Sequence, residues 1–194
     1  MKQNDTMQKK SLIPVFLETE RIYLRTLTQE DDFREYEAWL NNQANTSYMG
    51  SGKFPVTVFS LKKYVDSFSQ NQNGILTGIF IKNSDKHIGN ITLQQIDWKN
   101  KHGEIGIMVG DKDEWGKGYA TEAINLIAKH AFGKLNLHKL CAGVIAGNEG
   151  SCRAFEKVGF KVEGTLRDHF YLNDQYLSCY RLGFLKSEYG KGEF

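Results

Sequence analysis

Cysteine is scarce in this chain, and its spacing argues against the sites that cysteine usually builds. The three cysteines, Cys141, Cys152 and Cys179, are odd in number and show no CxxC spacing, so we expect neither a disulfide framework nor a zinc knuckle. The five histidines show no HExxH or comparable ligand spacing, which leaves a metal site without support. The sequence therefore predicts three buried free thiols and no bound metal.

Long apolar runs and an excess of charge of one sign are also missing. The first fourteen residues hold no apolar run of the length that a signal peptide or a membrane helix needs, so we expect a cytoplasmic protein without membrane contact. The formal net charge is only +2, which gives no reason to expect nucleic acid as a partner. The length suits one compact domain. We assign this domain to residues 15–186, between a mobile polar segment at 1–14 and a polar tail at 187–194.

Two helices are predicted near the start of the domain. Thr28 and Asp31 have the spacing of a capping box and precede an i, i+3, i+7 apolar stripe over 33–40. A second helical stripe covers 61–68. The segment 41–55 between these two helices has the composition of a loop.

The remaining pattern predicts a mixed sheet. Short polar turns join the first strands, as in antiparallel neighbours, whereas the helical spacing over 120–131 separates two strands and implies one parallel crossover. A shorter helix fits 149–158, with Asn148 as N-cap and Gly159 as C-terminal stop. We therefore predict an α/β (α+β) fold with a mostly antiparallel sheet of about seven strands, one β-α-β crossover and helices on both faces. The predicted strands cover 21–26, 75–81, 87–98, 104–109, 139–145, 160–171 and 175–184.

A glycine-rich loop connects the strand over 104–109 to the helix that follows it. The loop reads Trp115-Gly-Lys-Gly-Tyr-Ala-Thr121. The first amides of a helix have no internal partner and the helix dipole adds partial positive charge, so such a loop can cradle a pyrophosphate with its backbone. Gly116 and Gly118 permit a close approach. A Gly-x-Gly pair also occurs in loops that only need positive φ angles, so the fragment alone leaves both interpretations open.

Two other phosphate-binding motifs fit less well. The Gly-x-x-x-x-Gly-Lys-Ser/Thr spacing of a Walker A loop is absent. A Rossmann site is a closer rival because the surrounding unit is β-α-β, but Thr121 stands where the third glycine or alanine belongs. The second strand also ends at 144–148 without the carboxylate that would hold a ribose hydroxyl. A dinucleotide site is therefore the weaker interpretation.

The segment 115–123, Trp-Gly-Lys-Gly-Tyr-Ala-Thr-Glu-Ala, resembles the acyl-CoA loop of GNAT acetyltransferases, particularly of the branch named for the RimJ and RimL ribosomal-protein N-acetyltransferases. Further matches to this branch follow in its usual order, and the resemblance spans about 17–184. It implies the GNAT fold and acetyl-CoA as acetyl donor. The further matches are Leu137-His-Lys-Leu140, Asn148, Ser151, Ala154-Phe-Glu-Lys-Val-Gly-Phe160 and Glu163-Gly164.

The resemblance implies where acetyl-CoA lies. Its pyrophosphate would rest on the glycine-rich loop and its pantetheine arm along the strand edge at 107–109, with Asn148 near that arm. The amine would attack the thioester directly, without a covalent enzyme intermediate. The residues implied to contact acetyl-CoA are Ile107, Met108, Val109, Trp115, Gly116, Lys117, Gly118, Tyr119, Ala120, Thr121, Asn148 and Ser151.

Three residues are candidates for the proton transfers. Glu104 alternates with Ile105 and so points to the opposite face of its strand, where it can face a cleft and act as base through water. By resemblance, Glu163 matches a carboxylate proposed to act in RimL-like enzymes, and Ser151 matches the serine that protonates the thiolate. Each also has an ordinary explanation, as a solvated strand-end glutamate, a surface strand residue or a first-turn helix serine.

The chain departs from the superfamily pattern at two positions. Trp115 stands where the loop usually begins with Gln or Arg, although the RimJ/RimL branch tolerates Trp. Phe155 occupies the place of the tyrosine that protonates the thiolate in many GNAT enzymes. That second departure leaves the general acid open.

The function expected from these features is N-acetylation of a primary amine. Possible acceptors are a protein N-terminus, an amino-sugar nucleotide, a polyamine and an aminoglycoside, and the protein would be a monomer or a homodimer. The missing tyrosine at Phe155 keeps a non-catalytic acetyl-CoA-binding or interaction module as an alternative. A dinucleotide-dependent oxidoreductase is a third hypothesis.

Overall fold

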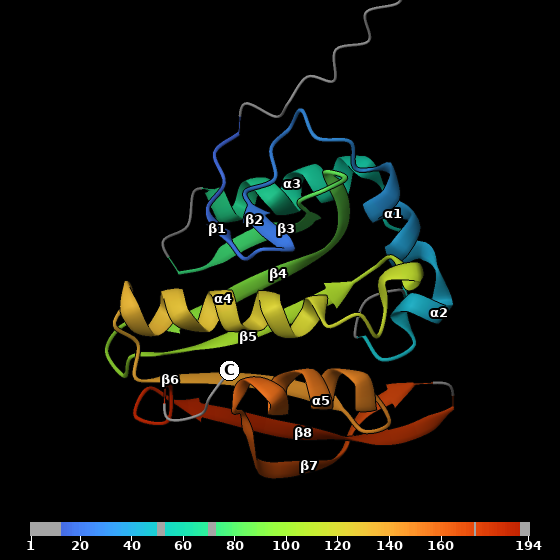
Figure 1. The fold of residues 1–194 in the computed structure, drawn as a ribbon. Helices are drawn as coiled ribbons and strands as arrows, with labels where there is room; N and C mark the ends of the chain where they lie inside the picture. The colour runs from blue at the N-terminus through green and yellow to red at the C-terminus, as the bar shows by residue number, and fades with distance from the viewer. Residues whose placement is uncertain (1–12, 50–52, 70–72, 173, 191–194) are drawn as a thin grey trace, which may run out of the picture.

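A computed structural model describes residues 13–49, 53–69, 73–172 and 174–190. In that part of the chain it shows one eight-stranded sheet with the order β1-β2-β3-β4-β5-β6-β8-β7 (Figure 1). Among the strands that the structure describes, only β5 and β6 pair in parallel, and the other neighbouring pairs are antiparallel. The predicted mixed sheet with one crossover is confirmed. The strands are β1 (Leu17–Glu18), β2 (Ile22–Arg25), β3 (Ile75–Ile81), β4 (Lys86–Asp97), β5 (His102–Val109), β6 (Lys139–Ile145), β7 (Lys161–Leu172) and β8 (Gln175–Leu185).

Helices cover both faces of this sheet, as predicted. On one face, α4 and α5 pack on apolar side chains that include Ile22 and Leu24. On the other face, α1 and α3 pack around residues such as Tyr23 and Phe80. Successive side chains of β2 therefore pack alternately into two separate hydrophobic cores, one on each face of the sheet. The helices are α1 (Arg34–Asn41), α2 (Gln43–Thr46), α3 (Val58–Ser69), the 3-10 turn η1 (Lys112–Glu114), α4 (Tyr119–Gly133) and α5 (Glu149–Val158).

Several local predictions need correction. The sheet has eight strands in place of about seven because β1 has two residues, too few to show an alternating pattern. Likewise, the predicted loop over 41–55 contains α2, whose four residues are too few for a helical stripe. Of the three thiols, Cys179 is buried, whereas Cys141 and Cys152 are only half-buried, and all three are free.

The predicted capping box also needs correction. The helix begins at Arg34, and its N-cap position is held by Phe33 without a side-chain hydrogen bond. Asp31 instead accepts a hydrogen bond from the backbone N–H of Thr28 at 2.7 Å, which closes a turn before the helix. The capping-box spacing therefore marked a turn before the helix, in which Asp31 also pairs with Arg25.

Most of the predicted flanking segments, 1–12 and 191–194, lie outside the described residues. Asn173, between β7 and β8, also lies outside them.

The parallel pairing between β5 and β6 is short and ends in the middle of β5. It covers three pairs, His102 with Lys139, Gly103 with Leu140 and Glu104 with Cys141. Beyond Glu104, β5 stays paired with β4 as far as Val109, while β6 continues along β8. The two central strands therefore separate after Glu104, and one edge of β5 has no partner among the described strands over 105–109.

Candidate active site

The turn into α4 leaves backbone donors free at the helix N-terminus. Gly118 is the N-cap residue, with a φ of 87° and no side-chain capping bond. Gly116 has a φ of 75°, so both positions lie in the left-handed region that favours glycine. A Cβ placed on Gly116 would meet no heavy atom within 4 Å. The first amides of α4 thus border open space and are available to an anion.

Side chains hold this loop against the end of β5. The indole Nε1 of Trp115 donates to the backbone oxygen of Val109 at 2.7 Å. The Nζ of Lys117 lies 2.8 Å from Oε2 of Glu114, and that hydrogen bond lowers the pKa of the Glu114 carboxyl. Lys86 contacts the other oxygen of the same carboxylate at 3.2 Å. The ammonium group of Lys117 is therefore engaged by a neighbouring carboxylate.

A cavity of about 640 Å³ opens beside the loop. Its size lies within the range of about 300–1,000 Å³ that is usual for small-molecule sites. Of the twelve residues predicted to contact acetyl-CoA, only Lys117 is not among those that line it. The lining residues that match the prediction are Ile107, Met108, Val109, Trp115, Gly116, Gly118, Tyr119, Ala120, Thr121, Asn148 and Ser151.

The start of α5 forms the wall opposite the loop. Asn148 is the N-cap of α5, and its side-chain oxygen accepts a hydrogen bond from the backbone N–H of Ser151 at 3.2 Å. Gly147 has a φ of 98°, and a Cβ there would lie 3.1 Å from the Tyr48 ring. This glycine therefore lets Tyr48 approach the end of β6 closely, and both residues line the cavity.

The sequence did not predict the rest of this wall, although a signal was present. Gly150, Arg153, Ala154 and Lys157 line the cavity, and their spacing of i, i+3, i+4 and i+7 marks one face of α5. The prediction for 149–158 rested on the Asn148 cap and the Gly159 stop, so it did not identify the helix face that lines the cavity.

A third wall comes from α2 and the residues that follow it. The side chain of Asn45 donates to the backbone oxygen of Gly110 at 2.9 Å, which ties α2 to the end of β5. Ala44, Asn45, Ser47, Tyr48 and Met49 all line the cavity. The segment 41–55, which was predicted as a loop, thus contributes lining residues, including Tyr48. The aromatic residues Trp39, Tyr171 and Tyr176 do not line the cavity.

Glu104 lies where β5 and β6 separate, and it is part of an ion pair. Its carboxylate accepts two hydrogen bonds from Arg181 of β8, at 2.7 and 3.2 Å, and the Arg181 guanidinium passes over Gly143. This pairing raises the pKa of Arg181. Glu104 does not line the cavity, but Ile107, three residues further along β5, does. At about 3.3 Å per residue, this separation is roughly 10 Å along the strand.

The other two positions singled out in the sequence lie away from the cavity lining. Glu163 forms an ion pair with Lys139 at 2.6 Å and packs over Gly183. Phe155 is 2% exposed, and its ring lies 5.0 Å from that of Phe160. A side chain at position 155 therefore packs in the core, and the structure does not bring Glu163 to the cavity.

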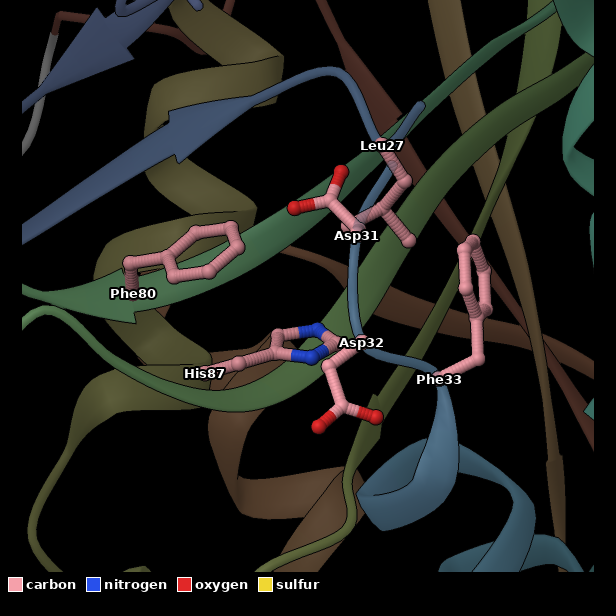
Figure 2. A pocket seen from close by; sticks show the side chains of 6 residues that line it. All are labelled: Leu27, Asp31, Asp32, Phe33, Phe80 and His87. Carbon is pink, nitrogen blue, oxygen red and sulfur yellow. The ribbon is translucent and has the colours of Figure 1, made fainter. Parts of the chain in front are cut away.

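A second, smaller cavity of about 160 Å³ lies near the start of α1. Figure 2 shows that Leu27, Phe33, Phe80, His87 and two carboxylates surround it. Both carboxylates already have partners, since Asp31 binds Arg25 and Asp32 binds Arg34. Burial lowers the pKa of His87, which favours its neutral form. The two carboxylates that line this cavity are therefore already neutralised by arginines of the same chain.

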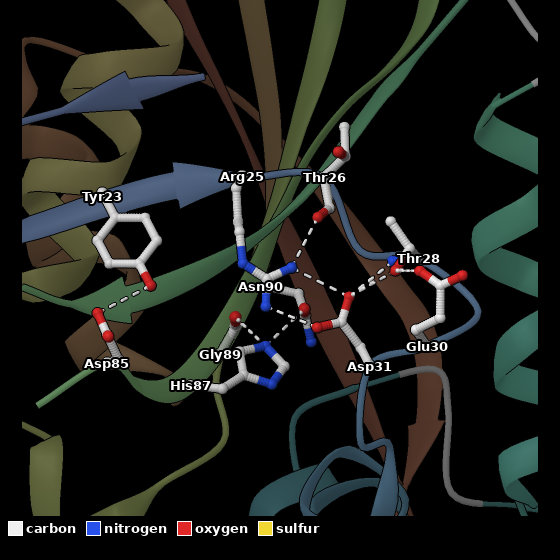
Figure 3. A network of polar contacts seen from close by, with 10 residues as sticks. All are labelled: Tyr23, Arg25, Thr26, Thr28, Glu30, Asp31, Asp85, His87, Gly89 and Asn90. Carbon is white, nitrogen blue, oxygen red and sulfur yellow. Dashed lines mark hydrogen bonds and ion pairs between the residues drawn. The ribbon is translucent and has the colours of Figure 1, made fainter. Parts of the chain in front are cut away.

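The ion pair between Arg25 and Asp31 is the centre of a buried polar network (Figure 3). The two guanidinium nitrogens donate to the two carboxylate oxygens at 2.6 and 3.0 Å, and the side chains are only 7% and 15% exposed. The guanidinium also lies 4.1 Å from the centre of the Phe80 ring. Burial opposes ionisation of Asp31, but hydrogen bonds from Arg25 and Thr28 lower its pKa overall. The network therefore fixes the turn that leads into α1.

We expect Asp31→Asn to lower the free energy of unfolding at pH 7 by about 3–5 kcal/mol, because it leaves a buried guanidinium without its counter-charge. The pKa of Asp31 is lowered in the folded state, so its contribution is complete above about pH 4 and is lost as the pH falls through the folded-state pKa. Urea unfolding at pH 7 and pH 3 measures both effects, and the difference between the proteins should shrink at pH 3.

Asp32→Asn is the matched control for this change. Asp32 and Arg34 are 57% and 83% exposed, so water screens their ion pair and its loss should lower the free energy of unfolding far less. Equal losses for the two variants would show that the burial of the Arg25 pair has no energetic consequence.

Two features are absent from the residues that the structure describes. Over 13–49, 53–69, 73–172 and 174–190, no group of three or more His, Cys, Asp or Glu side chains is arranged to hold a metal ion. Within the same part of the chain, no helix combines the length and apolar character needed to cross a bilayer.

Comparison with known proteins adds independent findings. The family model described as an acetyltransferase (GNAT) domain matches residues 21–161. The uncharacterized N-acetyltransferase p20 of Bacillus licheniformis is 30% identical over 89% of this chain and 97% of its own. Spermidine N(1)-acetyltransferase of Escherichia coli K12 is 34% identical over 52% of this chain and 54% of its own. The crystal structure of spermidine N-acetyltransferase from Vibrio cholerae with CoA and spermine superposes with a TM-score of 0.79 at 25% identity, over 88% of this chain and 99% of that one.

Proposed function

The chain belongs to the acetyltransferase (GNAT) family, and we propose that it transfers an acetyl group from acetyl-CoA to a primary amine. One observation carries the proposal. A single cavity is lined both by the start of α4 and by the part of β5 that has separated from β6. An anion-binding helix end and an unpaired strand edge are the two features that a pyrophosphate and an amide-containing arm require.

We propose that the backbone amides of 116–121 bind the pyrophosphate and that β5 binds the pantetheine arm along 107–109. The chemistry of the donors supports this fit. The N-cap residue Gly118 makes no side-chain capping bond, and the space beside Gly116 is open. Asn148 and Ser151 face the same cavity from the start of α5.

We propose Glu104 as the general base and Ser151 as the acid that protonates the leaving thiolate. Acetyl-CoA, when bound, supplies the thioester that the amine attacks. An arm that follows 107–109 toward the point of strand separation leads to Glu104, which supports the assignment of the base. Base assistance is needed because a lysine-like amine has a pKa of about 10.4 and an α-amine about 7.7–8.0. Glu163, paired with Lys139, is the alternative base that the resemblance offers.

The charge of the cavity supports an acceptor with a single amine, such as a protein N-terminus, over a polyamine. The two acidic residues in its lining are Glu114 and Glu149. Both are ion-paired, Glu114 with Lys86 and Lys117 and Glu149 with Arg153. A polycation would have to compete with these partners. An α-amino acceptor also agrees with the RimJ/RimL resemblance of the loop, and we propose a cytoplasmic enzyme that acts as a monomer or homodimer.

Thermal stabilisation by acetyl-CoA, followed by thiol release with a panel of amines, tests this function. We expect 1 mM acetyl-CoA to raise the melting temperature by several degrees, since a ligand at about 100 times its Kd adds about 2.7 kcal/mol. Thiol release should be faster with peptides that have a free N-terminus than with spermidine. Stabilisation without turnover of any amine would favour the non-catalytic binding module that Phe155 suggested. Stabilisation only by a nicotinamide nucleotide would favour the oxidoreductase.

A further inference from the structure

Arg21, in the turn between β1 and β2, reaches across to the glycine-rich loop. Its Nε donates to Oε1 of Glu122 at 2.6 Å, and a terminal nitrogen also contacts that oxygen. Its other terminal nitrogen donates to the backbone oxygen of Lys117 at 3.0 Å. The guanidinium carbon lies 4.9 Å from the centre of the Tyr119 ring. One side chain from the start of the chain thus contacts three residues around the loop.

The arginine is itself held in place. The hydroxyl of Thr19 donates to Oε2 of Glu122 at 2.7 Å and accepts a hydrogen bond from the backbone N–H of Arg21 at 3.2 Å. Glu122 belongs to the first turn of α4, and its side chain is 22% exposed. The loop, the helix and the β1–β2 turn are therefore joined by charge-assisted hydrogen bonds, which are stronger than neutral ones.

The contact with the Lys117 oxygen fixes a peptide plane. In a trans peptide the carbonyl and the next N–H point in opposite directions. Because the Lys117 carbonyl points to Arg21, the N–H of Gly118 points away from Arg21. Gly118 lines the large cavity and has a φ of 87°, a conformation in which glycine has more freedom to rotate than other residues. Without the hydrogen bond from Arg21 to the Lys117 carbonyl, the Lys117–Gly118 peptide could rotate more freely.

We infer that Arg21 is a positioning residue, which orients the Lys117–Gly118 peptide so that the Gly118 N–H faces the pyrophosphate of acetyl-CoA. The inference rests on the proposed function, because it assigns the pyrophosphate to this loop. It differs from a general stabilising role, since only the pyrophosphate part of the ligand should depend on Arg21. It also differs from neutralisation of Glu122, whose carboxylate would otherwise oppose an anion at the N-terminus of α4.

Calorimetric binding to three probes tests the inference without a known acceptor. The probes are CoA, adenosine 3′-phosphate 5′-diphosphate, which keeps the pyrophosphate, and pantetheine, which lacks it. For Arg21→Gln we expect Kd to rise about tenfold for the first two probes, as for loss of one charge-assisted hydrogen bond. Pantetheine should bind the variant and the wild type equally. An unchanged Kd for CoA, or an equal loss for pantetheine, would overturn the inference.

Further variants separate the rival explanations. The double variant Arg21→Gln, Glu122→Gln removes the unbalanced carboxylate, and we expect CoA binding to stay weak, whereas recovery to the wild-type Kd would mean that Arg21 only neutralises charge. Arg34→Gln removes an exposed ion pair between Arg34, at the start of α1, and Asp32 before it, and it should change no Kd. If Arg21→Gln does not fold, Arg21→Lys keeps the charge but loses the planar fork, and it should weaken CoA and spare pantetheine.

The same measurements separate failure of the inference from failure of the proposed function. Wild-type protein that binds neither CoA nor adenosine 3′-phosphate 5′-diphosphate at millimolar concentration would reject both. Wild-type binding with no effect of Arg21→Gln would reject the inference alone.

Discussion

Replacement of Glu104 by Gln is expected to lower kcat by about 100-fold near neutral pH, the lower end of what a positioned base contributes. Glutamine keeps the shape of the side chain and can still accept a hydrogen bond from Arg181, but it cannot take a proton from the amine. The variant then depends on amines that are already neutral. The loss should therefore be greatest at low pH and shrink as the pH approaches the pKa of the acceptor. A pH profile of kcat from pH 6 to 10 measures this.

Two further variants serve as a control and as a test of the alternative base. Glu18→Gln removes another strand glutamate, which pairs with Lys82 at 2.7 Å, and should leave the profile unchanged. Glu163→Gln tests the alternative carboxylate. If Glu104→Gln loses activity equally at every pH, the residue only positions Arg181. If its rates are normal and those of Glu163→Gln fall, the base is Glu163.

Replacement of Gly118 by Val should weaken acetyl-CoA binding by at least about 100-fold, or roughly 2.7 kcal/mol. The φ of 87° at this position is strained for a β-branched side chain. The backbone would have to rotate, and the N–H that the loop presents would turn with it. A Cβ there would also lie 3.3 Å from a guanidinium nitrogen of Arg21. Titration with acetyl-CoA by calorimetry gives the change in Kd.

Gly190→Val is a matched control for backbone strain. Gly190 has a φ of 83° and no heavy atom within 4 Å of its ideal Cβ position, and it does not line the cavity. We expect it to cost about 1–3 kcal/mol of stability and to leave Kd for acetyl-CoA unchanged. If Gly118→Val binds acetyl-CoA as the wild type does, the pyrophosphate does not lie on this loop and the proposed function loses its main support.

The fold could be predicted well because most elements are long enough to show a period. The strand over 139–145 and the helix over 149–158, with its Asn148 cap and Gly159 stop, were predicted with the bounds that the structure has. Elements of two to four residues, such as α2, have no period to detect. The Thr28 and Asp31 pattern misled for a physical reason. A carboxylate three residues after a threonine suits a capping box, but here the buried guanidinium of Arg25 determined its partner.

The site could be predicted only where its residues are close together in the sequence. The conformations of the glycine-rich loop and of the Asn148 cap depend on residues that are neighbours in the sequence, so their spacing was enough to identify them. Tyr48 approaches Gly147 across about one hundred positions of sequence, and Glu104 meets Arg181 on a strand 77 residues away. Such pairs depend on the strand order of the finished sheet, which periodicity does not encode.

The short parallel pairing between β5 and β6 has a mechanical consequence. Only three residue pairs join β5 to β6, so few backbone hydrogen bonds connect the two parts of the sheet along this seam. The cavity opens along that seam. A ligand whose amides bonded to the open edge of β5 would act as a partial extra strand and lend the sheet stiffness that its own chain does not supply. The ligand would then strengthen the sheet at the place where β5 and β6 separate.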